Sequence, residues 1–304
     1  MYDTIILGAG PAGLSAAIYS KRYDMNILVI GKEMGTMSEA DEVCNYLGYP
    51  SIDGPSMAMK FTSHAEELGA KIKREEAHSI EKKGKHFVVK TGSGKYEAKT
   101  VIYALGGEKR KMGLPEENDY VGRGVSYCFT CDAAFFRDKV VAVAGGANSA
   151  AMGALVLAKF AKKVYVVYRR DSLRAFPAYV EKVKDNEKIE TIFNKNIVKI
   201  KGEKGVEKVV LKDTETGEES ELDLDGVFVE FGHIPNSGLA EKAGIDTEKG
   251  GRIKVGGDMS TNLPGFYAAG DVTNGSNGFD QVITAAAEGA VAAGSAYKKI
   301  TEGD

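Results

Sequence analysis

The feature of this sequence most directly suited to chemistry is a pair of cysteines, Cys128 and Cys131, separated by two residues. In a C-x-x-C pair, one thiolate can attack a substrate disulfide and the other can resolve the mixed disulfide that forms. A structural zinc site would need four clustered ligands, whereas the four histidines are scattered along the chain. We therefore predict a redox dithiol and no metal site. The third cysteine, Cys44, stands alone, and we expect it to be a buried structural thiol.

Asp132 directly follows the second cysteine. Thiol–disulfide exchange needs a group that manages protons, and no histidine is close in sequence. We predict that Asp132 is this acid/base; the alternative is that it only caps a helix or closes a turn.

A glycine-rich turn near the N-terminus predicts a dinucleotide site. An apolar run that ends at Leu7 is typical of a buried strand, and Gly8-Ala9-Gly10-Pro11-Ala12-Gly13 follows at once. A small-residue helix and a second strand ending at Ile30 come next, which completes the strand, G-x-G-x-x-G, helix, strand arrangement. Gly8 permits the tight turn, Gly10 lets the backbone approach a pyrophosphate, and Gly13 lets the helix pack on the strand.

The same pattern recurs in the middle of the chain. A strand over residues 139–144 leads into Gly145-Gly146-Ala147-Asn148-Ser149-Ala150, and a helix and a strand over residues 163–168 follow. The first glycine is separated by 22 positions from Ile30 in one copy and from Val167 in the other. Two βαβ units of equal length predict two dinucleotide sites.

Arginines follow the second strand of this middle copy, at positions 169, 170 and 174. Arg169, Arg170 and Arg174 would lie where a ribose 2′-phosphate distinguishes NADP from NAD. The alternative is that all three are solvated surface charges.

A third signal lies near the C-terminus, where a strand ends in Gly270-Asp271 and a small-residue helix follows over residues 281–293. A carboxylate at a strand end beside a helix N-terminus suits a polyol hydroxyl and the polar edge of a flavin. We therefore predict an α/β fold with two Rossmann-like dinucleotide-binding domains, the second inserted into the first. Residues 1–114 and 235–304 would form the FAD-binding domain, and residues 115–234 would form an NAD(P)-binding-type domain that carries the cysteines.

The composition agrees with a globular enzyme of two domains. The length of 304 residues is about twice that of a typical domain, and the net charge of −3 argues against nucleic-acid or membrane-surface partners. No apolar run approaches the ~20 residues that span a bilayer, and no targeting pattern is visible, so we expect a cytoplasmic protein.

With these motifs in this order, the sequence resembles low-molecular-weight thioredoxin reductases over essentially its whole length. The segments that carry the resemblance are residues 8–13, 104–106, 113–115, 122–125, 126–132, 168–174, 232–236 and 268–272. The resemblance implies a homodimer that passes electrons from NADPH through FAD and the cysteine pair to thioredoxin. It also implies that Cys131 faces the flavin, that Cys128 attacks thioredoxin, and that the middle domain swivels about linkers near residues 113–117 and 232–236.

The resemblance also implies which residues contact each cofactor. For FAD these are Gly8, Gly10, Pro11, Ala12, Gly13, Gly31, Gly35, Thr36, Asn45, Ala104, Gly106, Gly270, Asp271, Gln281 and Val282. For NADPH they are Gly145, Asn148, Ser149, Arg169, Arg170 and Arg174.

Several positions depart from the family's pattern. The third consecutive glycine of the nicotinamide turn is Ala147, and the two glutamates of the following helix are Met152 and Gly153. Near the flavin, the arginine that usually precedes Gln281 is Asp280. NADPH remains the predicted donor because the three arginines are kept; the alternative is the same chemistry with ferredoxin or a reduced deazaflavin as donor.

Three other functions fit the sequence less well. A flavoprotein that reduces ferredoxin or a small oxidant directly would lack the cysteine pair. A reductase with a fused peroxidase-type partner would need a further thioredoxin-like domain, and no sequence feature favours a non-catalytic redox sensor.

Overall fold

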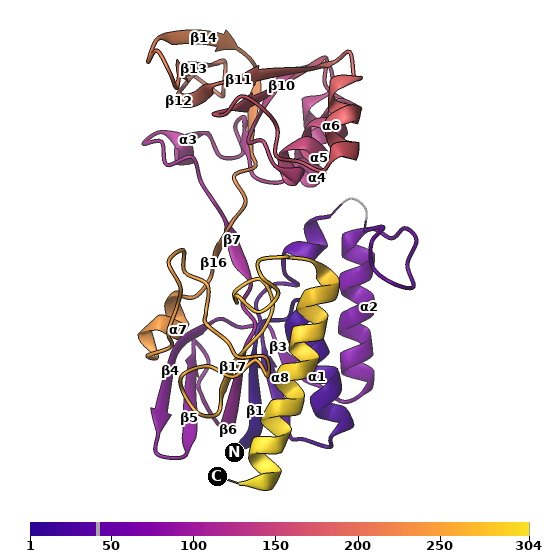
Figure 1. Ribbon diagram of the computed structural model, residues 1–304, viewed down its shortest axis with the longest axis vertical. Helices are drawn as coiled ribbons and strands as arrows, with labels where there is room; N and C mark the ends of the chain where they lie inside the picture. Colours follow the sequence, from indigo (N-terminus) through magenta and orange to yellow (C-terminus); the bar gives the residue numbers. More distant parts are fainter. Residues whose placement is uncertain (41–42, 304) are drawn as a thin grey trace. The chain divides into compact units, whose positions relative to one another are not determined.

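The protein is described by a computed structural model that covers residues 1–40 and 43–303, with the backbone alone at positions 39, 130 and 131. The chain divides into two compact units (Figure 1). Unit 1 consists of Met1–Glu108 and Ile234–Asp304, and unit 2 consists of Lys109–His233. The predicted insertion of one α/β domain into another is confirmed. The chain crosses between the units at 108/109 and 233/234, instead of at the predicted boundaries of 114/115 and 234/235.

The first crossing is earlier than predicted because residues 112–117 are bound within unit 2. The buried carboxylate of Glu117 accepts hydrogen bonds from the backbone N–H groups of Met112, Gly113 and Leu114, at 2.9, 2.8 and 3.3 Å. The segment predicted as the first linker, residues 113–117, is therefore held by hydrogen bonds within unit 2. The crossing strands β7 (Gly107–Lys109) and β16 (His233–Pro235) instead pair as a two-stranded sheet.

Unit 1 is built on a seven-stranded sheet. Its order is β3 (Lys71–Lys73), β2 (Ile27–Ile30), β1 (Tyr2–Leu7), β6 (Lys95–Tyr103), β5 (His86–Thr91) and β4 (Ala77–Lys83), with β17 (Phe266–Ala268) also on β6. Strands β1, β2, β3, β6 and β17 are parallel, whereas β4 and β5 form an antiparallel hairpin. The carboxyl ends of β1, β6 and β17 therefore lie at one edge, where ligands bind in open α/β sheets.

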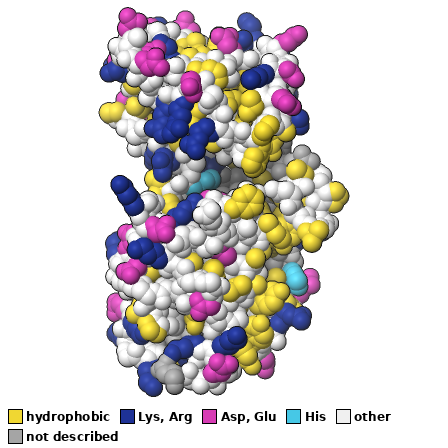
Figure 2. All heavy atoms as spheres, in the orientation of Figure 1, with side chains coloured by type: hydrophobic (Ala, Val, Ile, Leu, Met, Phe, Trp, Pro, Cys, Tyr) yellow, Lys and Arg dark blue, Asp and Glu magenta, His cyan; other side chains and the backbone are white. Residues whose placement is uncertain are grey.

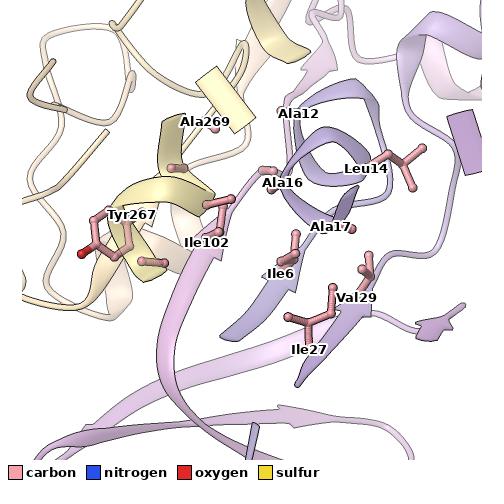
Figure 3. Close-up of a cluster of buried hydrophobic side chains, with 14 of the residues drawn as sticks. Ile6, Ala12, Leu14, Ala16, Ala17, Ile27, Val29, Ile102, Tyr267 and Ala269 are labelled. Atoms are coloured by element: carbon pink, nitrogen blue, oxygen red, sulfur yellow. The ribbon is translucent and has the colours of Figure 1, made fainter. Parts of the chain in front are cut away.

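Helices α1 (Pro11–Arg22) and α8 (Val282–Glu302) pack together on one face of this sheet, with α2 (Gly54–Glu67) beside α1 (Figure 1). Figure 3 shows Ile6, Val29 and Ile102 of the strands meeting Ala16 and Ala17 of α1 in this core. The alternate residues of the strands face a second core on the opposite side. Two short helices, η1 (Thr36–Glu39) and α7 (Gly238–Lys242), complete unit 1.

Unit 2 has a five-stranded parallel sheet and a three-stranded antiparallel sheet. The first has the order β11 (Ile189–Phe193), β10 (Lys163–Tyr168), β9 (Val140–Ala144), β15 (Gly226–Val229) and β8 (Val125–Ser126), and the second the order β12 (Lys195–Lys201), β13 (Lys208–Asp213) and β14 (Glu219–Asp223). The helices of the unit are α3 (Glu117–Tyr120), α4 (Phe129–Asp132), η2 (Ala133–Phe136), α5 (Asn148–Leu157) and α6 (Pro177–Lys184).

The strands of both predicted βαβ units are confirmed, and the helices differ mainly at their ends. Helix α8 runs to Glu302, beyond the predicted end at residue 293, because its small-residue face stays buried through Ala296 and Tyr297 stacks on Tyr23 with ring centroids 4.7 Å apart. Within the described residues, no helix is long and apolar enough to cross a membrane. Figure 2 shows acidic and basic side chains interspersed on the visible face of unit 1.

Candidate active site

The first glycine turn lies between β1 and α1, and two of its glycines are required by the chain's own packing. A Cβ added at Gly8, where φ is +114°, would lie 2.1 Å from the carbonyl oxygen of Ala104. A Cβ added at Gly13 would lie 1.9 Å from the carbonyl oxygen of Gly8. At Gly10 the nearest atom, the Cα of Gly35, would be 3.9 Å away. Internal packing does not demand a glycine at position 10, so a glycine there suits the close approach of a pyrophosphate to the N-terminus of α1.

Other residues predicted to contact FAD surround this turn. A Cβ at Gly31 would lie 2.6 Å from the backbone nitrogen of Ala9, and a Cβ at Gly35, where φ is +79°, would lie 3.1 Å from the Cα of Gly10. Thr36 begins η1 directly after Gly35. Gly106 also has positive φ, at +60°. The structure thus places the tip of β2 and the start of η1 against the turn.

The C-terminal part of the predicted FAD site lies against the same turn. A Cβ added at Gly270 would lie 3.0 Å from the Cβ of Ala12, and one at Gly289 of α8 would lie 2.0 Å from the carbonyl oxygen of Ala12. These two close approaches bring Gly270-Asp271 to the N-terminus of α1. The two segments of the predicted split site are therefore adjacent, although most of the chain separates them in sequence.

Asn45 and Gln281, both predicted to contact FAD, are joined directly. The amide nitrogen of Asn45 donates to the side-chain oxygen of Gln281 at 2.8 Å. Gln281 is the N-cap of α8 and forms a capping box with Thr284, so its backbone is fixed at the helix N-terminus. Val282 is the first residue of α8.

Asp271 is the most strongly perturbed carboxyl of this region. Burial, together with the charges of Asp280 and Glu288, raises the pKa of Asp271 from its ordinary value to about 6, and the positive charge of Arg252 opposes this rise. A carboxylate that is partly withdrawn from water is suited to accept hydrogen bonds from a hydroxylated ligand.

The cysteine motif lies at the start of α4 in unit 2. Cys128 is partly exposed, and its backbone N–H donates to Ser126 Oγ at 3.0 Å. The N–H of Asp132 donates to the carbonyl oxygen of Cys128 at 3.1 Å, which fixes one turn of helix around the pair. Cys131 lies within α4 by its backbone, and its side chain is outside the described part of the chain. Asp132 is partly exposed and ends α4.

The second glycine turn lies between β9 and α5 and differs in detail. A Cβ at Gly145, where φ is +149°, would lie 2.4 Å from the carbonyl oxygen of Glu230, and one at Gly146 would lie 2.3 Å from the ring of Tyr168. The Asn148 side chain accepts from the N–H of Phe176 at 2.7 Å, so it holds the segment before α6. Ser149 is partly exposed in the first turn of α5.

The three arginines lie near this turn and are exposed. Arg169 and Arg170 directly follow β10, and the N–H of Arg174 donates to the carbonyl oxygen of Gly146 at 2.7 Å. The loop is therefore tied to the glycine turn, and the arginine side chains are available to a ligand at the same edge.

The structure corrects the prediction for Cys44 and gives a packing reason for the unusual residue Gly153. Cys44 is exposed, so its prediction as a buried thiol is wrong; its neighbour Val43 pairs with Ile52 and takes the buried place in the small core around Met37 and Met57, which leaves Cys44 at the surface. Gly153, which departs from the family's pattern, contacts α4: a Cβ there would lie 3.0 Å from the ring of Phe129. Among the described residues, no three His, Cys, Asp or Glu side chains are grouped to hold a metal.

Three residues in or near these sites carried no motif in the sequence. Glu288 is buried in α8 and accepts from Gly270 N–H at 2.7 Å and from Thr273 Oγ1 at 2.8 Å. Glu117 accepts from the hydroxyl of Tyr127, the residue before Cys128, and burial and this contact raise the pKa of Tyr127. Arg252 contacts Asp280. Only Glu288 could have been recognised from the sequence. It lies on the small-residue face of α8, and a charged side chain on a packing face needs hydrogen-bond partners.

A dinucleotide fold divided by a second one that carries a C-x-x-C motif is the architecture of a two-nucleotide disulfide reductase. The family model described as pyridine nucleotide-disulphide oxidoreductase matches residues 2–289, and the chain belongs to this family. The chain is 41% identical to the thioredoxin reductase of Bacillus subtilis (strain 168) over 305 residues, which cover 99% of this chain and 96% of that protein. A thioredoxin reductase of Treponema pallidum is 43% identical, with 98% and 97% covered.

A solved structure of Lactococcus lactis thioredoxin reductase in its FR conformation is also similar. Its TM-score is 0.95 at 38% identity, and the match covers 99% of this chain and all of that one.

Proposed function

We propose that this chain is a thioredoxin reductase, which passes electrons from NADPH through FAD and the dithiol of Cys128 and Cys131 to thioredoxin. The observation that carries the proposal is the place of the C-x-x-C motif. It lies in a dinucleotide fold inserted between the two parts of another. The full-length identity of 41% to a thioredoxin reductase supports the same activity.

FAD would be held by unit 1, which corresponds to the FAD-binding domain predicted from the sequence at residues 1–114 and 235–304. Gly10, which internal packing does not require, and the N-terminus of α1 suit the pyrophosphate. Asp271 would accept a hydrogen bond from a ribityl hydroxyl, and Asn45 and Gln281 would lie at the α8 end of the flavin. When bound, FAD would supply the transfer of an electron pair from the nicotinamide to the cysteine disulfide.

The protein's own chemistry would be thiol–disulfide exchange. In the reduced enzyme, the Cys128 thiolate attacks one sulfur of the thioredoxin disulfide, which forms a mixed disulfide and releases one thioredoxin thiolate. The Cys131 thiolate then attacks the Cys128 sulfur, which forms the Cys128–Cys131 disulfide and releases the second thioredoxin thiolate. The two protons lost by the enzyme thiols equal the two gained by thioredoxin, and Asp132 would relay them.

NADPH would bind to unit 2, at the turn of Gly145 and the exposed arginines. An arginine at this edge would form charge-assisted hydrogen bonds to a 2′-phosphate. We further propose that the enzyme is a cytoplasmic homodimer whose partner is thioredoxin, with no nucleic-acid or membrane partner.

An anaerobic titration tests the donor. NADPH, NADH and reduced ferredoxin are offered separately to the FAD-loaded protein while flavin absorbance is recorded. We expect NADPH to bleach the flavin, and Arg169→Ala with Arg170→Ala to raise KM for NADPH roughly ten- to a hundredfold more than KM for NADH. Lys204→Ala, at an exposed site elsewhere in unit 2, is the control. Bleaching by reduced ferredoxin or deazaflavin but not by millimolar NADPH would assign the donor to the alternative and leave the dithiol step intact.

Cysteine variants test the dithiol. Cys131→Ser should lose turnover and accumulate a covalent adduct with thioredoxin through Cys128, detected by non-reducing electrophoresis and mass spectrometry. Cys128→Ser should form no such adduct. Cys44→Ser is the matched control, because Cys44 is an exposed free thiol, and it should keep full activity. Turnover by either of the first two variants would remove the pair from the mechanism.

A further inference from the structure

The turn that carries Asp271 is attached to the start of α8 by one side chain, Arg252. Nη1 of Arg252 donates to the carbonyl oxygens of Asp271 and Thr273, at 3.0 Å in both cases. The same guanidinium forms a two-point contact with Asp280, with Nη1–Oδ1 at 2.9 Å and Nη2–Oδ2 at 2.7 Å. One residue therefore holds four acceptor contacts on two separate segments of the candidate FAD site.

The backbone on both sides of these contacts is fixed. The buried Ile253 donates its N–H to the carbonyl oxygen of Val272 at 2.8 Å and accepts from the N–H of Asn274 at 3.1 Å. The side chain of Asn274 in turn accepts from the N–H of Val255 at 3.1 Å. The backbone from which Arg252 projects is therefore already hydrogen-bonded to the turn that its side chain contacts. Because of this, the side chain loses little conformational freedom when its guanidinium binds.

On the other side of Arg252, Asp280 is directly joined to the N-cap of α8. Gln281 donates from its side chain to the carbonyl oxygen of Asp280 at 2.6 Å, and Gln281 also accepts from Asn45 at 2.8 Å. A movement of Asp280 would therefore move Gln281 and its partner.

Charge also makes this contact necessary. Asp271, Asp280 and Glu288 line one hollow beside Gly270, and Arg252 contacts the carboxylate of Asp280 and the backbone of Asp271. Two-point guanidinium–carboxylate contacts are strong and directional, and Arg252 is mostly buried, with 28% of its side chain exposed. The negative charge at position 280, where the family resemblance leads one to expect an arginine, is thereby compensated from a different segment.

We propose that Arg252 is a positioning residue of the flavin site: it fixes the turn of Asp271 against Asp280, immediately before Gln281, and supplies the positive charge that position 280 lacks. The proposal rests on the proposed binding of FAD by unit 1. It assigns to Arg252–Asp280 a role in cofactor affinity that no sequence motif indicates.

The test measures FAD affinity of the apoprotein by flavin fluorescence across pH, for three variants. Arg252→Met keeps the length of the stem and removes the charge, Asp280→Asn removes one partner, and Lys99→Met is the control. Lys99 forms an ion pair with Asp3 at 2.7 Å at the amino end of β1, at the opposite edge of the same sheet.

We expect Arg252→Met to raise the Kd of FAD at least about tenfold at pH 7.5, and Asp280→Asn to raise it by a smaller factor. FAD affinity should be lost on acidification, and the midpoint pH of this loss should move in opposite directions in the Arg252→Met and Asp280→Asn variants. Arg252→Met removes the charge that opposes protonation of Asp271, so the midpoint rises; Asp280→Asn removes a neighbouring negative charge, so it falls. A purely structural defect would move neither midpoint.

The groups that face Asp271 are Arg252, Asp280 and Glu288, so a change in either of the first two is expected to report on Asp271. An Arg252→Met protein with the Kd and midpoint of the Lys99→Met control would overturn the proposal. If Arg252→Met does not fold, Asp280→Asn decides, and a wild-type Kd and midpoint in that variant would likewise overturn it. A wild-type apoprotein that binds no FAD would instead refute the proposed function.

Discussion

The two βαβ units of this chain use opposite residue sizes at one pair of facing positions. In unit 1, Ala9 of the glycine turn faces Gly31, just beyond β2: a Cβ at Gly31 would lie 2.8 Å from the Cβ of Ala9. In unit 2 the corresponding residues are Gly146 and Tyr168, and a Cβ at Gly146 would lie 2.3 Å from the tyrosine ring. Each unit thus needs one glycine at this contact, after the second strand in unit 1 and in the glycine turn in unit 2.

The third position of the fingerprint also differs between the units. Gly13 in unit 1 leaves no room for a methyl group next to Gly8. Its counterpart in unit 2 is Ala150, which is buried, and its methyl group is accommodated in the turn that Gly145 begins. Helix α5 can carry that methyl group only if it does not approach its turn as closely as α1 does.

These differences teach that the spacing of the glycines does not by itself say why each glycine is there. Gly8, Gly13 and Gly31 are required by the packing of unit 1, whereas a Cβ at Gly10 would meet only the Cα of Gly35, at 3.9 Å. In unit 2, Gly146 makes room for the Tyr168 ring. A fingerprint glycine that the chain's own packing does not require, such as Gly10, is the one whose presence points to a ligand.

The largest expected effect follows from the third position. Gly13→Ala would place a methyl group 1.9 Å from a backbone oxygen, which cannot rotate away, so we expect a loss of about 3 kcal/mol or more in the free energy of unfolding. The matched change Ala150→Gly in unit 2 removes a methyl group from a helix and should cost only about 1–2 kcal/mol. Denaturant titrations of the apoproteins followed by circular dichroism compare them. Equal losses would contradict the tighter helix approach in unit 1.

The next effect concerns Asp271, a partly buried carboxyl of unit 1. Its native pKa of about 6 lies above the ordinary value of 3.8, so between these values the native state binds more protons than the unfolded state. The free energy of unfolding of the apoprotein should therefore fall as pH rises from about 4 to about 6, by up to about 3 kcal/mol.

Asp271→Asn should remove this slope. Asp213→Asn in unit 2 is the control, because hydrogen bonds from Thr216 and Glu215 lower the pKa of Asp213 to about 2. The contribution of Asp213 to the free energy of unfolding is lost only at pH values below the range in which Asp271 titrates. Unfolding titrations at several pH values measure both slopes, and an unchanged slope in Asp271→Asn would rule out the burial effect.

The smallest expected effect tests the reversed sizes directly. Gly146→Ala should cost about 1–2 kcal/mol, because the Tyr168 ring is partly exposed and can move. Tyr168→Ala in the same protein should recover most of that loss, whereas in unit 1 Ala9→Gly should not rescue Gly31→Ala, since the closest atom there is a backbone nitrogen at 2.6 Å. Thermal denaturation of the two single variants, Gly146→Ala and Gly31→Ala, and of the two double variants measures the rescue in each unit. Rescue in both units, or in neither, would show that the two contacts are equivalent.

The sequence by itself determined the repeated βαβ pattern, the inserted arrangement of the domains and the cysteine pair. These features depend on local rules: apolar strands, glycine spacing and the equal length of the two copies can be recognised without knowledge of distant contacts. The same reasoning failed at Cys44, which is exposed, because burial depends on what packs over a loop.

Only the tertiary structure decided which residues support the sites. Arg252 contacts Asp280, 28 residues further along the chain, and no motif links the two. Glu117 binds the backbone of residues 112–114, so this segment belongs to unit 2 and the chain crosses between the units before it, at 108/109. Such contacts are invisible in sequence because they join side chains to backbone groups and to charges brought together by folding. The sequence therefore predicted where the cofactors and the dithiol belong, and the packing of distant segments determined how those places are held and charged.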